Sequence, residues 1–173
     1  MAFDVYLQLT GANNVQGEST DKAHPNWIKI SSFSFGANNP CTVSSGTTGL
    51  SAGQPSLSSF SVTKDTDTAS VLLFQACCEG LHFTNMTVQV CTQSGSSATA
   101  QNVVCLYEFT NVLVEAVQWS ATSGTSDRPI ESVSFGFGSV QVTYTPITAQ
   151  GAAGTKVGPA AWSVTQNTAA NQG

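Results

Sequence analysis

The sequence predicts a mainly β protein: a small closed β-barrel of two packed antiparallel sheets with one flanking α-helix. Several segments alternate apolar and polar residues, the period of a half-buried strand, and one segment follows the helical period. Two strands also change the parity of their apolar residues, and strands that bend in this way suit a barrel. We expect residues 1–173 to form a single domain, because this length fits one core and no internal repeat divides it.

The first predicted strand is FDVYLQL, in which Phe3, Val5, Leu7 and Leu9 share one side. A turn-rich segment follows, and the next strand begins at Trp27. This first pair of strands should form part of the core.

The two parity changes occur in strands that carry Phe-x-Phe beside glycine. In the first, the isoleucines occupy even positions and Phe33 and Phe35 occupy odd ones, so either a bulge near Ser31–Ser32 shifts the phase or both faces are partly covered. In the second, ESVSFGFGSVQVTY, the change falls at Gly138–Ser139. A glycine at this point predicts a bulge or a tight bend.

Between these strands lies a segment without periodicity. It is rich in Gly, Ser and Thr and contains Pro40 and Pro55, so we predict an extended loop over about 37–58. A loop of this length is uncommon in a compact domain and is often functional. It is either a surface insertion or an arm that orders against a neighbouring copy.

One helix is predicted over about 68–79, where the apolar residues take the spacing i, i+3, i+4, i+7, i+8. Asp67 or Thr68 can cap its start and Gly80 can end it. A second apolar side, unusual for a surface helix, is formed by Val71, Phe74 and Cys78. The helix therefore sits in a groove or meets another subunit.

The C-terminal half continues as strands. Residues 102–120 predict two strands with a break near Thr110–Asn111, and a short strand is expected around Trp162–Val164. The polar end, about 165–173, predicts a frayed tail.

Charged residues are scarce, at 9% of the chain, and the formal net charge is −5. Typical soluble domains hold roughly 25% charged residues. Either the domain has Ser/Thr-rich loops, or much of its surface is covered by copies of itself, since charge is depleted at interface cores. The five basic residues are scattered: Lys22, Lys29, Lys64, Arg128 and Lys156. We therefore expect no nucleic-acid partner.

Two further expectations concern location. No apolar run reaches membrane-spanning length, so we expect no membrane insertion. The N-terminal segment lacks the features of a signal peptide, which predicts a chain made and folded in the cytoplasm.

The residues that could carry chemistry do not form a catalytic pattern. The five cysteines include no C-x-x-C motif, and we interpret them as small, buried, reduced hydrophobes. A pair of His82 with Cys77 or Cys78 would need an electropositive site that the apolar surroundings do not offer. We predict that the chain is not an enzyme, with no catalytic, cofactor-binding or metal-binding residue.

Five segments in order resemble the Hcp family (haemolysin-coregulated protein), the tube proteins of bacterial type VI secretion systems. They are MAFDVYLQLTG, GESTDKAHPNWIKISSFSFG, FSVTKDTDTASVLLFQACCEGLHF, ESVSFGFGSVQVTYTP and AAWSVTQN. The resemblance implies a β-barrel with one helix, hexameric rings, and stacking of rings into a hollow tube. It also implies a contractile sheath, a spike protein at the tip and effector cargo as partners, with assembly in the bacterial cytoplasm and secretion without a signal peptide.

The resemblance also implies three kinds of functional position. Ser34, between the two aromatics, should face the lumen and its cargo. The outer side of the helix should form a lateral interface through Val71, Phe74 and Cys78. Ring stacking should use Asn39, Pro40, Thr47, Leu50 and Gln54 of the loop.

Alternative functions remain at this stage. One is a tail-tube protein of a phage-like contractile injection particle. Another is a secreted monomeric effector or carbohydrate-binding β-domain. A third, a cysteine-dependent hydrolase, is disfavoured by the surroundings of the cysteines.

Overall fold

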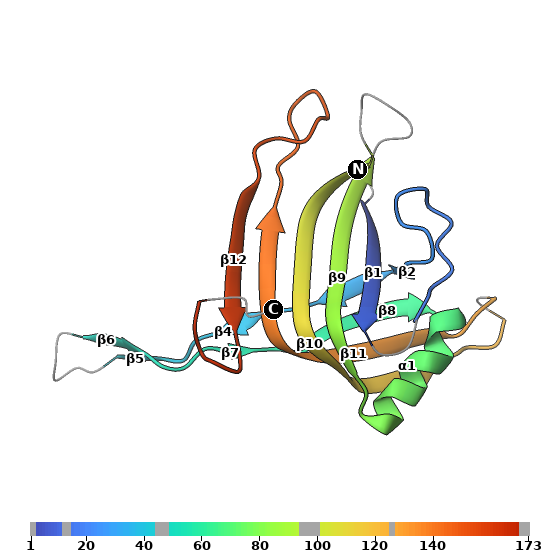
Figure 1. The fold of residues 1–173 in the computed structure, drawn as a ribbon, viewed down its shortest axis with the longest axis horizontal. Coiled ribbons are helices and arrows are strands. Elements are labelled where there is room, and N and C mark those ends of the chain that lie inside the picture. The colour runs from blue at the N-terminus through green and yellow to red at the C-terminus, as the bar shows by residue number, and fades with distance from the viewer. Residues whose placement is uncertain (1–2, 12–14, 44–48, 94–100, 125–126, 170–173) are drawn as a thin grey trace.

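The computed structural model describes residues 3–11, 15–43, 49–93, 101–124 and 127–169. It confirms the predicted fold class, because one helix lies against an antiparallel sheet that curves into a nearly closed barrel (Figure 1). In chain order the elements are β1 (Phe3–Gly11), β2 (Ile28–Ile30), β3 (Ser32–Ser34), β4 (Ala37–Asn38), β5 (Cys41–Val43), β6 (Leu50–Ala52), β7 (Ser56–Leu57), β8 (Phe60–Asp65), α1 (Thr68–Glu79), β9 (His82–Gln93), β10 (Gln101–Ser120), β11 (Ile130–Tyr144) and β12 (Val157–Ser163).

The barrel closes at Ser31. The strand order of the main sheet is β2-β1-β9-β10-β11-β8-β3, with β12 on the other part of β11, so β2 and β3 are its two ends. Only Ser31 separates these strands in the chain, and its amide donates a 2.8 Å hydrogen bond to Thr63 of β8. The first parity change is therefore neither a bulge nor a single strand with both faces partly covered. It is a corner where the chain leaves β1 and joins β8.

The second parity change occurs without a shift of register. Of the two outcomes predicted at Gly138–Ser139, a bulge or a tight bend, the bulge is absent, and the irregularities of this strand pair lie in the neighbouring β10. There Asn111 has a φ of 51°, and an extra residue, Glu115, forms a bulge. The predicted break near Thr110–Asn111 is wrong, because asparagine tolerates the left-handed conformation and β10 stays continuous. Figure 1 shows β10 and β11 bending from one layer of the barrel into the other.

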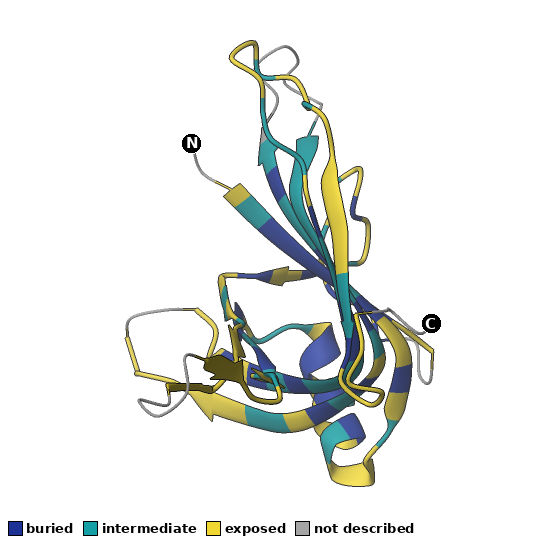
Figure 2. Ribbon diagram, turned by 90° about the vertical axis from the view of Figure 1, so that its left-hand side faces the viewer, coloured by how far each residue is buried: buried dark blue, intermediate teal, exposed yellow. Residues whose placement is uncertain are grey.

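Aromatic rings fill the core between these layers. Phe60, Phe109 and Phe135 are fully buried, and Figure 2 shows buried positions along the strands of the curved sheet and on α1. Phe33 stacks on Phe60 with ring centroids 5.4 Å apart, and Phe35 meets Phe109 edge-on at 5.8 Å. Phe35 also contacts Phe137, with ring centroids 5.8 Å apart, so the two Phe-x-Phe motifs contribute facing rings to one core.

The segment predicted as an extended loop is a projecting β-hairpin, which we call the arm (residues 37–57). Its described parts pair as β4 with β7 and as β5 with β6, and they continue the β3–β8 pair away from the barrel (Figure 1). Its strands contain only two or three residues each, too few to show an alternating period. Thr47 lies outside the described residues.

Helix α1 agrees with its predicted bounds of about 68–79. Asp67 caps its start, accepting from the Ala69 amide, and the Ser70 hydroxyl accepts from the Asp67 amide in return. Gly80 ends it with a φ of 65°, a conformation that glycine adopts without steric cost.

The C-terminal segment is more ordered than predicted. After β12, a turn is closed by a hydrogen bond of 2.8 Å from the Ser163 amide to Thr168. The Val164 amide also donates to Gly138 of β11 at 2.8 Å. The frayed-tail prediction is therefore wrong for residues 165–168, and residues 170–173 lie outside the described part.

Candidate functional site: a hydroxyl-lined face of the barrel

Ser34 lies on the outer face of the barrel. Strand alternation places Phe33 inward, where its ring contacts Phe60 and Tyr107, and turns Ser32 and Ser34 outward. Both serines are exposed. The prediction that Ser34 points away from the core is therefore consistent with the fold.

The register extends this face across three strands. It forms a surface of β3, β8 and β11 that we call the hydroxyl wall, and its residues are Ser32, Ser34, Ser61, Thr63, Ser132 and Ser134. One row joins Ser34, Ser61 and Ser134. In the second row the partners are Ser32, Thr63 and Ser132. The Ser61 and Ser134 hydroxyls are 3.0 Å apart and hydrogen-bond to each other. Both rows consist of uncharged hydroxyl groups, which can donate and accept hydrogen bonds.

One carboxylate lies beside the hydroxyl wall. Glu115, at the bulge of β10, accepts a hydrogen bond of 2.5 Å from Ser59, next to the start of β8. Between them is Gly136 of β11, where an added Cβ would come within 2.6 Å of Glu115 Oε1. No local pattern in the sequence indicates this group, because only the cross-strand register brings its three residues together.

Helix α1 has one packed face and one exposed face. Ala69, Leu73 and Ala76 are fully buried against the barrel. On the other face Val71 is 71% exposed and Phe74 is 48% exposed, and Cys78 is exposed as well. These are the three positions predicted for a lateral interface, and the isolated chain leaves them open to solvent.

A buried ion cluster fixes the start of α1. Lys64 Nζ lies 2.6 Å from Asp67 and 2.6 Å from Glu131. It also donates to the Ser70 hydroxyl at 3.1 Å. Glu131 Oε2 accepts from Trp119 Nε1 of β10 at 2.7 Å, and the Trp119 ring contacts Phe74. The exposed helical face is thus held rigidly to the barrel.

The arm presents the remaining predicted positions, of which Asn39, Pro40, Leu50 and Gln54 are exposed. Leu50 pairs with Val43, and these two apolar side chains are 75% and 76% exposed. The segment 37–58 contains no charged residue. The arm is therefore a neutral ribbon with an apolar pair at the outermost described position.

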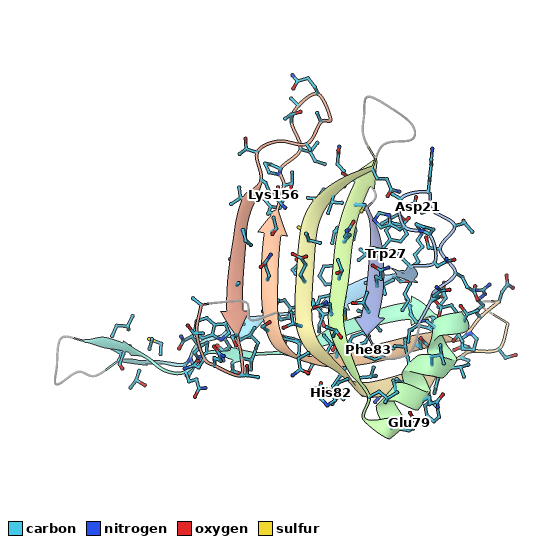
Figure 3. All side chains as sticks on the ribbon, viewed as in Figure 1. Asp21, Trp27, Glu79, His82, Phe83 and Lys156 are labelled. Carbon is cyan, nitrogen blue, oxygen red and sulfur yellow. The ribbon has the colours of Figure 1, made fainter. Side chains whose placement is uncertain are left out.

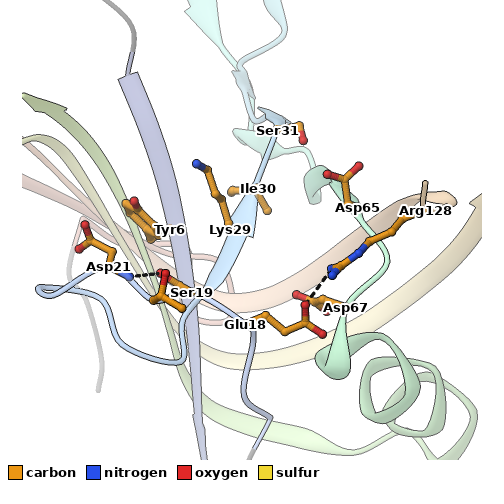
Figure 4. Close-up of a pocket in the computed structure, with 11 residues that line it drawn as sticks. Tyr6, Glu18, Ser19, Asp21, Lys29, Ile30, Ser31, Asp65, Asp67 and Arg128 are labelled. Atoms are coloured by element: carbon orange, nitrogen blue, oxygen red, sulfur yellow. Dashed lines mark hydrogen bonds and ion pairs between the residues drawn. The ribbon is translucent and has the colours of Figure 1, made fainter. Parts of the chain in front are cut away.

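A polar groove of about 510 Å³ occupies the opposite flank, where the segment before β2 meets the start of α1 (Figure 4). Glu18 pairs there with Arg128 at 2.7 Å and accepts from the Thr68 amide at 3.2 Å. The hydrogen bond from Arg128 lowers the pKa of the Glu18 carboxyl. These contacts hold the segment that connects β1 to β2 (described residues 15–27), which we call the connecting segment, against the start of the helix.

His24 is buried beside β1. Its ring stacks on Tyr6 with centroids 4.3 Å apart and meets Trp27 edge-on. Nδ1 lies 3.0 Å from Asp21, and Nε2 lies 2.9 Å from Gln89. Figure 3 shows Asp21 and Trp27 together beside β1. The contact with His24 lowers the pKa of Asp21, so this cluster anchors the connecting segment to the barrel.

The cysteines differ in exposure, which corrects their interpretation as uniformly buried. All five are free; Cys41 and Cys78 are exposed, and only Cys91 is buried. Burial raises the pKa of the Cys91 thiol to about 11. Cys91 lies 3.8 Å from His24, but a thiol with this pKa is a poor nucleophile.

The described residues lack two kinds of feature. They contain no cluster of three or more His, Cys, Asp or Glu side chains placed to hold a metal ion. None of their helices has the length and apolarity to cross a membrane.

The model of one protein family, the type VI secretion system effector Hcp, matches residues 6–144, more than half of the chain. The chain belongs to the Hcp family. Protein Hcp1 of Pseudomonas aeruginosa is 31% identical to it over 96% of this chain and 98% of the relative. The chain is thus a type VI secretion protein and a component of that apparatus.

Solved structures agree with this Hcp assignment. One described as a type six secretion system protein is 41% identical, with a TM-score of 0.88 over 96% of this chain and 99% of the other. Hcp1 from Salmonella typhimurium, at 23% identity, shows the same fold with a TM-score of 0.74 over 96% of this chain and 98% of its own.

Proposed function

We propose that this Hcp chain is the structural subunit of the inner tube of a type VI secretion system. Copies assemble into hexameric rings, and the rings stack into a hollow tube that carries effectors in its lumen. The observation that carries the proposal is the exposed apolar face of α1. A monomer gains nothing from leaving Val71 mostly exposed and Phe74 half exposed beside a well-packed inner face.

A lateral contact on this face would remove these side chains from water. Complete burial of a valine or phenylalanine side chain stabilises by about 1.5–3 kcal/mol. The buried ion cluster of Lys64 holds the helix in place, so that little order has to be gained on association. Val71, Phe74 and Cys78 are the positions proposed for this contact.

The hydroxyl wall is proposed to face the lumen, with Ser34 among the residues that touch cargo. Uncharged hydroxyls can hydrogen-bond to many protein surfaces without the strong pairing that opposite charges provide. Such a surface suits a transport channel, where cargo must be held and then released. The chain has this role without catalysing a reaction.

The arm is proposed to join successive rings through Asn39, Pro40, Thr47, Leu50 and Gln54. It is neutral and apolar at its described end, which matches the composition of interface cores. A heterologous contact of this kind repeats along an axis and generates a filament. Within this proposal the tube meets a spike protein at its tip and a contractile sheath around it, and it is assembled in the bacterial cytoplasm before export.

The mass of the purified protein in solution tests the proposal. Light scattering over a wide range of concentrations should give the mass of a hexamer or of its multiples. A strict monomer at the highest concentration would contradict the tube function and would favour a secreted monomeric β-domain instead.

A further inference from the structure

The fold builds a pocket around Glu115, a carboxylate beside the hydroxyl wall. Glu115 is the extra residue of the bulge in β10, and a bulge redirects a side chain from the regular alternation. The side chain extends over Gly136 of β11 to Ser59, which donates to Oε2 at 2.5 Å. Any side chain at position 136 would displace the Glu115 carboxylate, because its Cβ would come within 2.6 Å of Oε1. Three neighbouring strands thus hold one carboxylate in a defined place.

The size and lining of the pocket define the ligand class. Its volume is about 190 Å³, below the roughly 300–1,000 Å³ of small-molecule sites. The lining consists of Leu57, Ser58, Ser59, Glu115, Gly136, Phe137 and Val164. A carboxylate and two hydroxyls therefore stand beside three apolar side chains. A lysine or arginine side chain matches this arrangement, with its cationic head on Glu115 and its methylene stem on the apolar side.

The described part of the chain does not supply this cation. Three of its basic residues pair elsewhere: Lys29 with Asp4, Lys64 with Asp67 and Glu131, and Arg128 with Glu18. No ion pair with Glu115 occurs among the described residues. One oxygen of the carboxylate is occupied by Ser59, and a carboxylate has capacity for further donors.

We propose that Glu115, Ser59 and Gly136 form a binding pocket for one cationic side chain, arginine or lysine, of a cargo protein. The inference rests on the proposed function in so far as the wall faces the lumen. A single exposed ion pair contributes little to the free energy of binding. Repetition around a ring would convert this weak contact into a useful one for a cargo with several basic side chains.

Peptide binding to the full chain tests the pocket. The probe is a fluorescent Gly/Ser peptide with several spaced arginines. The control peptide has the same sequence but carries citrulline, which is neutral, in place of each arginine. At low salt, fluorescence anisotropy should show about tenfold tighter binding of the arginine peptide. Glu115→Gln should abolish the difference. Gly136→Ala should reduce it, because the added Cβ displaces Glu115 Oε1.

The matched control is Glu108→Gln, which removes a carboxylate from the same strand whose partner is Gln141 at 3.0 Å. This variant should keep the native preference. If Glu115→Gln keeps it too, the pocket is not the cation site and the proposal is overturned. If Glu115→Gln abolishes ring formation, a neighbouring chain supplies the cation, which also overturns the cargo site. If the native chain forms no rings but still binds the arginine peptide more tightly, and Glu115→Gln removes this preference, the tube function is contradicted while the cation pocket stands.

Discussion

Lys64 Nζ lies 2.6 Å from Glu131 Oε1, although neither side chain is more than 1% exposed. The same nitrogen contacts Asp67, the residue that caps α1, at 2.6 Å. Glu131 in turn accepts from Trp119 of β10. One buried ammonium group therefore connects the start of the helix to the strands beneath it.

This cluster predicts that replacing Lys64 lowers the free energy of unfolding more than replacing Glu131 does. Lys64→Met leaves two carboxylates facing each other without a cation, and we expect a loss of about 3–5 kcal/mol in the free energy of unfolding. Glu131→Gln should cost less, because Lys64 keeps Asp67 and Trp119 can donate to the new amide. Urea unfolding at one fixed protein concentration measures both effects, since assembly also stabilises the folded chain. Equal losses for the two variants would contradict this account of the cluster.

The exposed side of α1 predicts that Phe74→Ser weakens rings without unfolding the chain. Phe74 is 48% exposed, so its replacement should change the stability of the monomer by less than about 1 kcal/mol. Analytical ultracentrifugation should show the ring dissociating at higher protein concentration than the native ring does. Gln75→Ala, also on the exposed surface of α1, is the control and should leave the ring unchanged. Unchanged rings with Phe74→Ser would remove this face from the lateral interface.

Shortening the arm should separate ring formation from stacking. Replacement of residues 41–52 by a two-residue turn keeps the β4–β7 pair that joins the arm to the barrel. Electron microscopy should then show rings in the usual number but few or no tubes. Tubes as long as those of the native protein would show that the arm has no part in stacking.

The free cysteines report which surface each assembly step covers. In dissociated chains, Cys41 on the arm and Cys78 on α1 should react with iodoacetamide, whereas Cys91 should not, because it is buried and its thiol has a pKa of about 11. Ring formation should protect Cys78, and tube formation should protect Cys41 in addition. Mass spectrometry after timed alkylation gives the rates. Alkylation of Cys78 at the same rate in rings as in dissociated chains would contradict the lateral contact.

Local patterns in the sequence predict the helix and several strands well. Five apolar residues at helical spacing, with Asp67 before them and Gly80 after them, define α1 because every signal lies within one short segment. The outward orientation of Ser34 also follows from local alternation, since its neighbours Phe33 and Phe35 pack in the core. Strands of two or three residues offer no such period, so the sequence predicts a loop where the structure has the arm.

The features that shape the candidate site depend on contacts between distant segments. Serines alternate with apolar residues in β3, β8 and β11, but only the register aligns Ser34 with Ser61 and Ser134. The pocket at Glu115 needs a bulge in one strand and Gly136 in the next, and no local pattern specifies that combination. The ion pair of Lys64 with Glu131 similarly joins two strands that the sequence shows only separately.

A reconstruction of the assembled protein by electron cryomicroscopy tests the central proposal most directly. We predict six-fold rings with an open channel, in which β3, β8 and β11 turn the hydroxyl wall towards the channel and Ser34 lies on its surface. Solid particles or isolated monomers would contradict the tube function. Rings with Ser34 on the outside would contradict the assignment of the wall to the lumen.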